Sequence, residues 1–132
     1  MDINIHSIMT ADESGEGMVT FARNTAKSLV TNNLTRSQIR NIFSEVRQIE
    51  AVWEKADSTA KEAALRRLNM LKPKLAYQTA RTSSMELLQR TLSDAIDEVT
   101  KSQAEKRDQT FKRFMELFEA ILAYHRAEGG RN

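Results

Sequence analysis

Residues able to do catalytic or metal chemistry are few and poorly spaced in this chain of 132 residues. The two histidines, His6 and His125, form no Glu-x-x-His units of the kind that bind metal pairs in helical bundles, and there is no cysteine. No G-x-S-x-G segment marks a nucleophilic serine, and the four glycines form no phosphate-cradling loop. The sequence therefore predicts no catalytic residue, no metal site and no cofactor.

Lysine and arginine side chains offer a different chemistry, because nine of the 20 cations gather in two stretches without acidic residues. Residues 17–44 and 63–85 contain no Asp or Glu. The nine cations are Arg23, Lys27, Arg36, Arg40, Arg66, Arg67, Lys72, Lys74 and Arg81. A net charge of +2 therefore conceals a dipolar distribution of charge along the chain.

Helical spacing arranges many of these cations in rows. At 100° per residue, Arg36, Arg40 and Arg47 fall within about 40° of one another. A second row, spaced by seven residues, consists of Arg67, Lys74 and Arg81. Such rows fit an extended polyanion, because each neutralised phosphate releases counterions, and an arginine plane or tyrosine ring can stack on a base. Two interpretations stay open at this point: a nucleic-acid surface, or ordinary solvated helix faces.

The elements that carry these rows follow an acidic leader. Residues 1–16 hold four carboxylates, no Lys or Arg and no sustained apolar period, which predicts a mobile segment with order beginning near Gly17. From Met18 the apolar residues recur every three or four positions, and this helix is expected to end around Asn32 and Asn33. Residues 17–132 are predicted to form one helical-bundle domain.

Capping patterns predict where the next helices begin. Thr35 and Gln38 have the spacing of a capping box, flanked by Leu34 and Ile39 as a hydrophobic staple, so a helix is predicted from Arg36. The same capping-box spacing recurs in the pairs Thr59/Glu62 and Ser83/Glu86. These pairs predict two further helix starts.

Apolar stripes predict the face that each helix buries. The stripe of the helix from Arg36 runs to Ala56 and includes Trp53 as an anchor of the core. The last helix carries a stripe of phenylalanines at 111, 114 and 118 and is expected to close at Gly129 and Gly130.

Pro73 interrupts the helix that follows Thr59. Proline lacks a backbone donor and its ring clashes with the preceding turn, so this helix is expected to kink or break near Leu71 and Lys72. Short connections between long helices favour antiparallel neighbours. The predicted fold is an all-α bundle of about five helices, one of them kinked at Pro73.

Composition excludes further classes of protein. The absence of cysteine rules out a disulfide framework and favours a reducing compartment, so a cytoplasmic location is expected. No basic and apolar export signal opens the chain, and no apolar run approaches the roughly 18 residues of a membrane span. No membrane partner is expected.

Two runs of the chain resemble a known family. LTRSQIRNIFSEVRQIE at 34–50 and LKPKLAYQTAR at 71–81 are similar, in order and spacing, to the signature stretches of the small subunit of type III-A CRISPR effector complexes, the Csm small subunit. The resemblance covers roughly residues 34–124 and leaves the acidic leader outside.

The resemblance implies a non-catalytic helical subunit that is present in more than one copy. Such a subunit would form an inner filament beside the backbone subunits, belong to one complex with the large subunit, and hold the duplex of guide RNA and target RNA in a basic channel. Recognition would use shape and phosphates. Carried onto this sequence, the phosphate contacts would be Arg36, Arg40, Arg47, Lys72, Lys74 and Arg81. Arg67 joins these candidates through its row.

Two further motif positions have competing interpretations. Gln38 already has a capping role, and Tyr77 fits either a base contact or a packed side chain. Two other functions also compete with RNA binding. One is a helical protein–protein adaptor with no RNA role, using the mixed charges of the last helix, and the other is a helical-bundle enzyme.

Overall fold

Helices make up the regular structure of residues 4–55 and 57–132, which are the residues described by this computed structural model. The α-helices are α1 (Ile5–Thr10), α2 (Glu16–Thr31), α3 (Arg36–Trp53), α4 (Ser58–Arg81), α5 (Glu86–Lys101) and α6 (Arg107–Ala127). Short 3₁₀ turns at Ser83–Met85 and Ala104–Lys106 precede α5 and α6. The prediction of an all-α bundle of about five helices is confirmed, with the short α1 as an addition.

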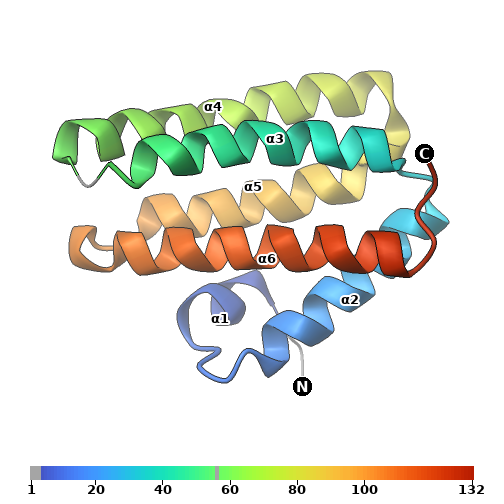
Figure 1. The fold of residues 1–132 in the computed structure, drawn as a ribbon, viewed down its shortest axis with the longest axis horizontal. Helices are drawn as coiled ribbons and strands as arrows, with labels where there is room; N and C mark the ends of the chain where they lie inside the picture. Colours follow the sequence, from blue (N-terminus) through green and yellow to red (C-terminus); the bar gives the residue numbers. More distant parts are fainter. Residues whose placement is uncertain (1–3, 56) are drawn as a thin grey trace.

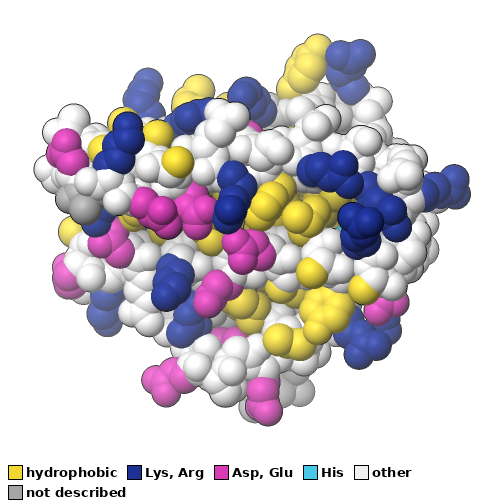
Figure 2. All heavy atoms as spheres, in the orientation of Figure 1, with side chains coloured by type: hydrophobic (Ala, Val, Ile, Leu, Met, Phe, Trp, Pro, Cys, Tyr) yellow, Lys and Arg dark blue, Asp and Glu magenta, His cyan; other side chains and the backbone are white. Residues whose placement is uncertain are grey.

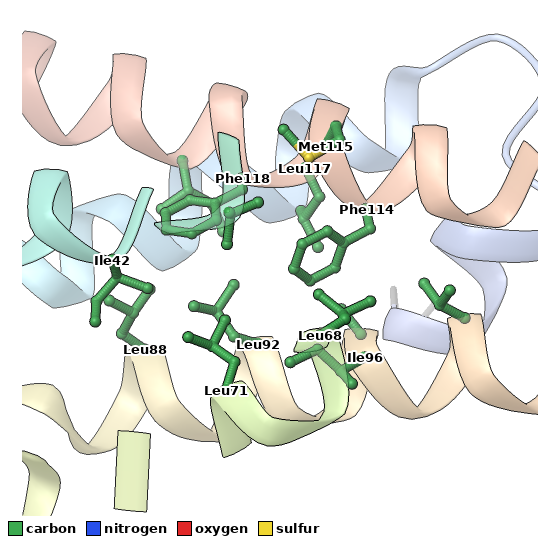
Figure 3. Packing of buried hydrophobic residues seen from close by; sticks show 14 of the residues in the cluster. Ile42, Leu68, Leu71, Leu88, Leu92, Ile96, Phe114, Met115, Leu117 and Phe118 are labelled. Atoms are coloured by element: carbon green, nitrogen blue, oxygen red, sulfur yellow. The ribbon is translucent and has the colours of Figure 1, made fainter. Parts of the chain in front are cut away.

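Helix α6 is the centre of the packing. It lies against α1, α2, α3 and α5, while α4 completes the bundle by packing on α3 and α5 (Figure 1). Phe114 and Phe118 of α6 are fully buried and point toward Leu92 of α5 and its apolar neighbours on α4 and α3 (Figure 3). The phenylalanine stripe therefore forms the core, as predicted.

Trp53 anchors the far end of α3. Its ring is buried and stacks on Phe111 of α6 with 4.2 Å between ring centroids. The indole Nε1 donates a hydrogen bond of 2.8 Å to the Asp108 carboxylate, so the polar edge of the buried ring is satisfied. Ala56, the last residue of the predicted stripe, lies outside the described residues.

Residues 5–10 of the predicted leader form a helix. Helix α1 begins after Asn4, whose side chain accepts a hydrogen bond from the backbone N–H of Ser7 at 2.8 Å. Ile8 and Met9 are 1% and 2% exposed and belong to the core. The sequence did not predict this helix, because six residues are too few to show an apolar period. The mobility of the leader and a boundary near Gly17 stay predictions.

One acidic residue of the predicted leader, Asp12, has a structural role at the start of α2. Its two carboxylate oxygens accept hydrogen bonds of 2.9 Å from the backbone N–H groups of Gly17 and Met18 in the first turn of α2. Arg113 of α6 donates to the backbone oxygens of Ile8 and Asp12 at 3.2 and 2.8 Å. These bonds tie the segment between α1 and α2 to the bundle.

The predicted helix boundaries are confirmed where the sequence offers a single good capping residue. The Thr35–Gln38 capping box is present, with reciprocal hydrogen bonds of 2.8 and 3.1 Å. Helix α2 ends at Thr31 with Asn32 as its C-cap, and Asn33 lies in the left-handed region at φ 67°. Gly129 likewise has φ 93° just after α6.

The other two capping boxes do not form. Asp57 caps α4 instead, accepting from the backbone N–H of Thr59 at 3.0 Å, so the helix begins one residue before Thr59. Ser83 begins a 3₁₀ turn, and α5 starts at Glu86 without a side-chain cap. An aspartate two residues upstream therefore outcompeted the predicted threonine.

Helix α4 continues through Pro73 without a break. Of the two predicted alternatives near Leu71 and Lys72, a break does not occur, and a kink at Pro73 stays a prediction. Pro73 lies on the exposed side of the helix, whereas Leu71 and Leu75 face the core.

We expect Ile8→Ala to lower the free energy of unfolding by about 2–5 kcal/mol, because it removes a fully buried side chain from the packing of α1. Urea unfolding followed by circular dichroism measures this loss. Val19→Ala is the control, since Val19 is 48% exposed and its truncation should cost little. Equal stability of Ile8→Ala and the wild-type protein would contradict the packing of α1 on the bundle and support a mobile leader.

Candidate nucleic-acid interface

The first predicted row of cations lies on the flank of α3 that faces α6. Arg36, Arg40 and Arg47 line a groove of about 680 Å³ between the two helices. Ile39, Phe43, Leu122 and Ala123 contribute apolar lining. Figure 2 shows this apolar surface in the hollow between α3 and α6, with Lys and Arg side chains along the rim. The row thus borders a groove and not a flat solvated face.

Arg36 is held partly buried at the start of α3. Its backbone N–H donates to the backbone oxygen of Arg131 at 2.6 Å, so the segment after α6 closes over the first turn of α3. The Arg36 Nε atom is buried and has no hydrogen-bond partner within the described chain. A buried donor without a partner is costly, so this end of α3 carries an unsatisfied polar group.

His125 fixes the same junction from the side of α6. It is 1% exposed, and its Nε2 donates a hydrogen bond of 2.8 Å to the backbone oxygen of Leu34. Gly130 lies so close that a Cβ there would overlap the His125 ring. This histidine is therefore a structural residue that positions the groove.

The second predicted row is drawn into ion pairs with α3. Arg67 donates to both carboxylate oxygens of Glu45 at 3.2 and 3.1 Å and to Gln48 at 2.7 Å. Lys74 lies 3.6 Å from the same carboxylate. The hydrogen bonds from Arg67 lower the pKa of Glu45 below its ordinary value of 4.5, against the opposing effect of partial burial. Arg67 and Lys74 therefore join α4 to α3.

Two more predicted residues have carboxylate partners. Lys72 contacts Asp97 of α5 at 2.5 Å, and Arg47 contacts Glu50 and Glu119 at 3.1 and 3.3 Å. Burial raises the pKa of Glu50, and Arg47 partly offsets that effect. Four of the seven predicted phosphate contacts thus already balance a carboxylate within the protein.

The other predicted cations gather at one end of the bundle. Among the described residues, Arg36, Arg40 and Arg81 make no ion pair, and the same holds for Arg126 and Arg131. These five arginines lie where α3 begins and α4 and α6 end, and we call them the basic end (Figures 1 and 2).

Sequence reasoning missed Arg126 and Arg131. Arg126 lines the groove beside Arg36 and Arg40, and Arg131 reaches Asn33 through a 3.3 Å hydrogen bond. The acid-free stretch at 120–127 could have revealed Arg126. Gly129, whose φ is positive, could have indicated that the chain turns back after α6 and brings Arg131 close.

An uncharged strip separates the two rows on the outward face of α3. It consists of four exposed residues within about 60° of one another, Ser37, Asn41, Ser44 and Gln48. The α6-facing arginines border it on one flank and the groove toward α4 on the other. No carboxylate on this strip would repel a polyanion lying along α3.

No group of three or more His, Asp or Glu residues suited to a metal ion occurs in the described part of the chain. The helices at residues 4–55 and 57–132 include none long and apolar enough to cross a membrane.

A comparison with known families decides the assignment. The family model Csm2 Type III-A matches residues 12–131, which include both signature runs, the groove and the basic end. The chain belongs to the Csm2 family. It is therefore a small, non-catalytic structural subunit of the type III-A CRISPR complex, the Csm complex. Helix α1 precedes the matched segment. No curated protein and no solved structure matches the chain.

We expect Glu45→Gln to lower the free energy of unfolding of this Csm2 subunit by about 0.5–1 kcal/mol at neutral pH, because it removes the charge that Arg67 and Lys74 share. The folded state lowers the pKa of Glu45, so its contribution is complete above 4.5 and is lost as the pH falls through the folded value. Urea unfolding from about pH 7 to about pH 3 should show the variant and wild type converging in acid.

The control for the lost charge is Glu62→Gln, since Glu62 is exposed on α4 and has no ion pair within the described residues. A Glu45→Gln deficit that stays constant down to the lowest pH would contradict an electrostatic role.

Proposed function

We propose that this subunit binds the duplex of guide RNA and target RNA through phosphate contacts at the basic end. One observation carries the proposal: five arginines without carboxylate partners in the described structure lie together, three of them predicted from the sequence. Arginine suits this role because its planar fork binds phosphate oxygens in pairs.

The shape of the surface supports a backbone contact. Double-stranded RNA is recognised chiefly through its shape, its phosphates and its 2′-hydroxyl groups, since its major groove is too narrow for side chains. The uncharged strip of α3 would let the duplex approach, and the arginines beside it would neutralise phosphates. Base pairing with the guide would supply the choice of target sequence.

The four cations that pair with carboxylates differ in how readily they can bind RNA. Arg47 and Lys74 are 56% and 64% exposed, so a phosphate can replace their carboxylates at little cost. Arg67 and Lys72 are less exposed and join α4 to α3 and α5. These two cations chiefly hold α4 against its neighbouring helices, and any contact that they make with RNA is secondary.

The remaining partners follow from the family. We propose that backbone subunits, the large subunit and further copies of this chain surround it in an inner filament. The groove beside α1, α2 and α5, which Asp94, Arg90 and Lys101 line, is available for a neighbouring subunit. The cytoplasmic location stays a prediction.

Replacing Arg40, Arg81 and Arg126 together with alanine should weaken binding of an RNA duplex and flatten its salt dependence. Each lost phosphate contact lowers the slope of log K against log salt by about 0.7–0.9, so the triple variant should lose about 2 to 3 units. Fluorescence anisotropy between about 50 and 200 mM salt measures the slope.

The matched control replaces Lys55, Lys106 and Lys112, three exposed cations at the opposite end of the bundle. It removes the same charge and should change the slope little. Equal slopes for the two triple variants would show that only net charge matters. Failure of the wild-type protein to bind RNA, with co-purification of protein partners alone, would favour the adaptor.

A further inference from the structure

Among the residues that the structure describes, Tyr77 is the most exposed of the large apolar side chains. The exposed fractions of Val19, Met70 and Tyr77 are 48%, 55% and 64%. Met70 and Tyr77 line the same groove between α3 and α4, whose volume is about 920 Å³. The groove lies against both signature runs, since Gln38 of the first also lines it. Neither packing in the core nor phosphate binding accounts for an aromatic ring placed there.

Arg81 holds the ring in place. It follows Tyr77 by one helical turn, its guanidinium carbon lies 5.8 Å from the ring centroid, and its Nη1 donates to the Tyr77 hydroxyl at 3.5 Å. The pair joins an aromatic surface to a cation of the basic end. Because the tyrosine is 64% exposed, much of its ring is open to a further stacking partner.

The surroundings of Tyr77 match the parts of a nucleotide. Lys74 and Arg81 supply positive charge, and the Glu45 carboxylate in the groove is neutralised by Arg67 and Lys74. The exposed amides of Asn41 and Gln78 line the same groove and can both donate to and accept from a base edge. A volume of about 920 Å³ is enough for a nucleoside-sized ligand.

We propose that Tyr77 stacks on an unpaired RNA base while Arg81 contacts the adjacent phosphate. Bases inside a continuous duplex are stacked on both faces, so only a base outside the helix offers a free face to the ring. The proposal rests on RNA binding at the basic end and adds a preference for RNA with an unpaired nucleotide.

Two RNA probes test this preference with the full chain. One is a fully paired duplex, and the other is the same duplex with one additional, unpaired 2-aminopurine nucleotide. Wild type should bind the second probe about 5- to 150-fold more tightly, the effect of one base stacked on an aromatic ring, and its 2-aminopurine emission should fall on binding. Fluorescence anisotropy and emission intensity measure the two effects.

Variants separate stacking from charge. Tyr77→Leu should lose the preference and the quenching yet bind the paired duplex as wild type does, while Tyr77→Phe should keep both. Arg126→Ala should weaken both probes equally, since Arg126 lines the other groove. Circular dichroism should show all variants folded, because both side chains are exposed.

Three outcomes would overturn the stacking proposal. The first is equal binding of both probes by wild type, and the second is a preference that Tyr77→Leu retains. The third is a preference that Tyr77→Phe loses as fully as Tyr77→Leu. In each case a steep salt dependence that Arg126→Ala reduces would leave the proposed phosphate binding intact. Failure of wild type to bind either probe would overturn both proposals.

Discussion

Burial of one face of α6 is the interaction on which the rest of the structure depends. Phe114 and Phe118 are fully buried, and their helix contacts α1, α2, α3 and α5. Each fully buried large apolar side chain contributes about 1.5–3 kcal/mol, so this stripe fixes the direction of α6 within the bundle. The direction matters for function, because it brings the last turn of α6 beside the first turn of α3. The basic end exists only in that arrangement.

The sequence was informative wherever a helix was long. Apolar periods of sixteen residues or more located the five long helices, since several turns repeat the same signal. Caps were harder to rank, because Asp57 and Thr59 are both good capping residues and only tertiary contacts select between them. Helix α1 was missed because its six residues contain too few turns to show a period. Only the fold shows that Ile8 and Met9 belong to the core.

The candidate site was only half visible in the sequence. Acid-free stretches identified cations without a local carboxylate, which is why Arg36, Arg40 and Arg81 were found. They could not reveal partners on other helices, such as Glu45, which lies 22 residues before Arg67. Arg126 was overlooked because Glu119 and Glu128 flank it in the sequence, whereas in the fold it faces the groove. Charge patterns thus indicate surfaces, and the packing of helices decides which charges stay unpaired.

The bond between His125 and Leu34 also links the basic end to folding. The two residues are 91 positions apart, and joining them costs the entropy of closing a long loop, so the bond depends on the docking of α6. A chain that has formed α3 and α4 alone carries its arginines dispersed, without Arg126 or Arg131 beside them. The concentrated positive surface therefore exists only where α6 has docked on α3, so that a polyanion meets its strongest attraction in the folded subunit.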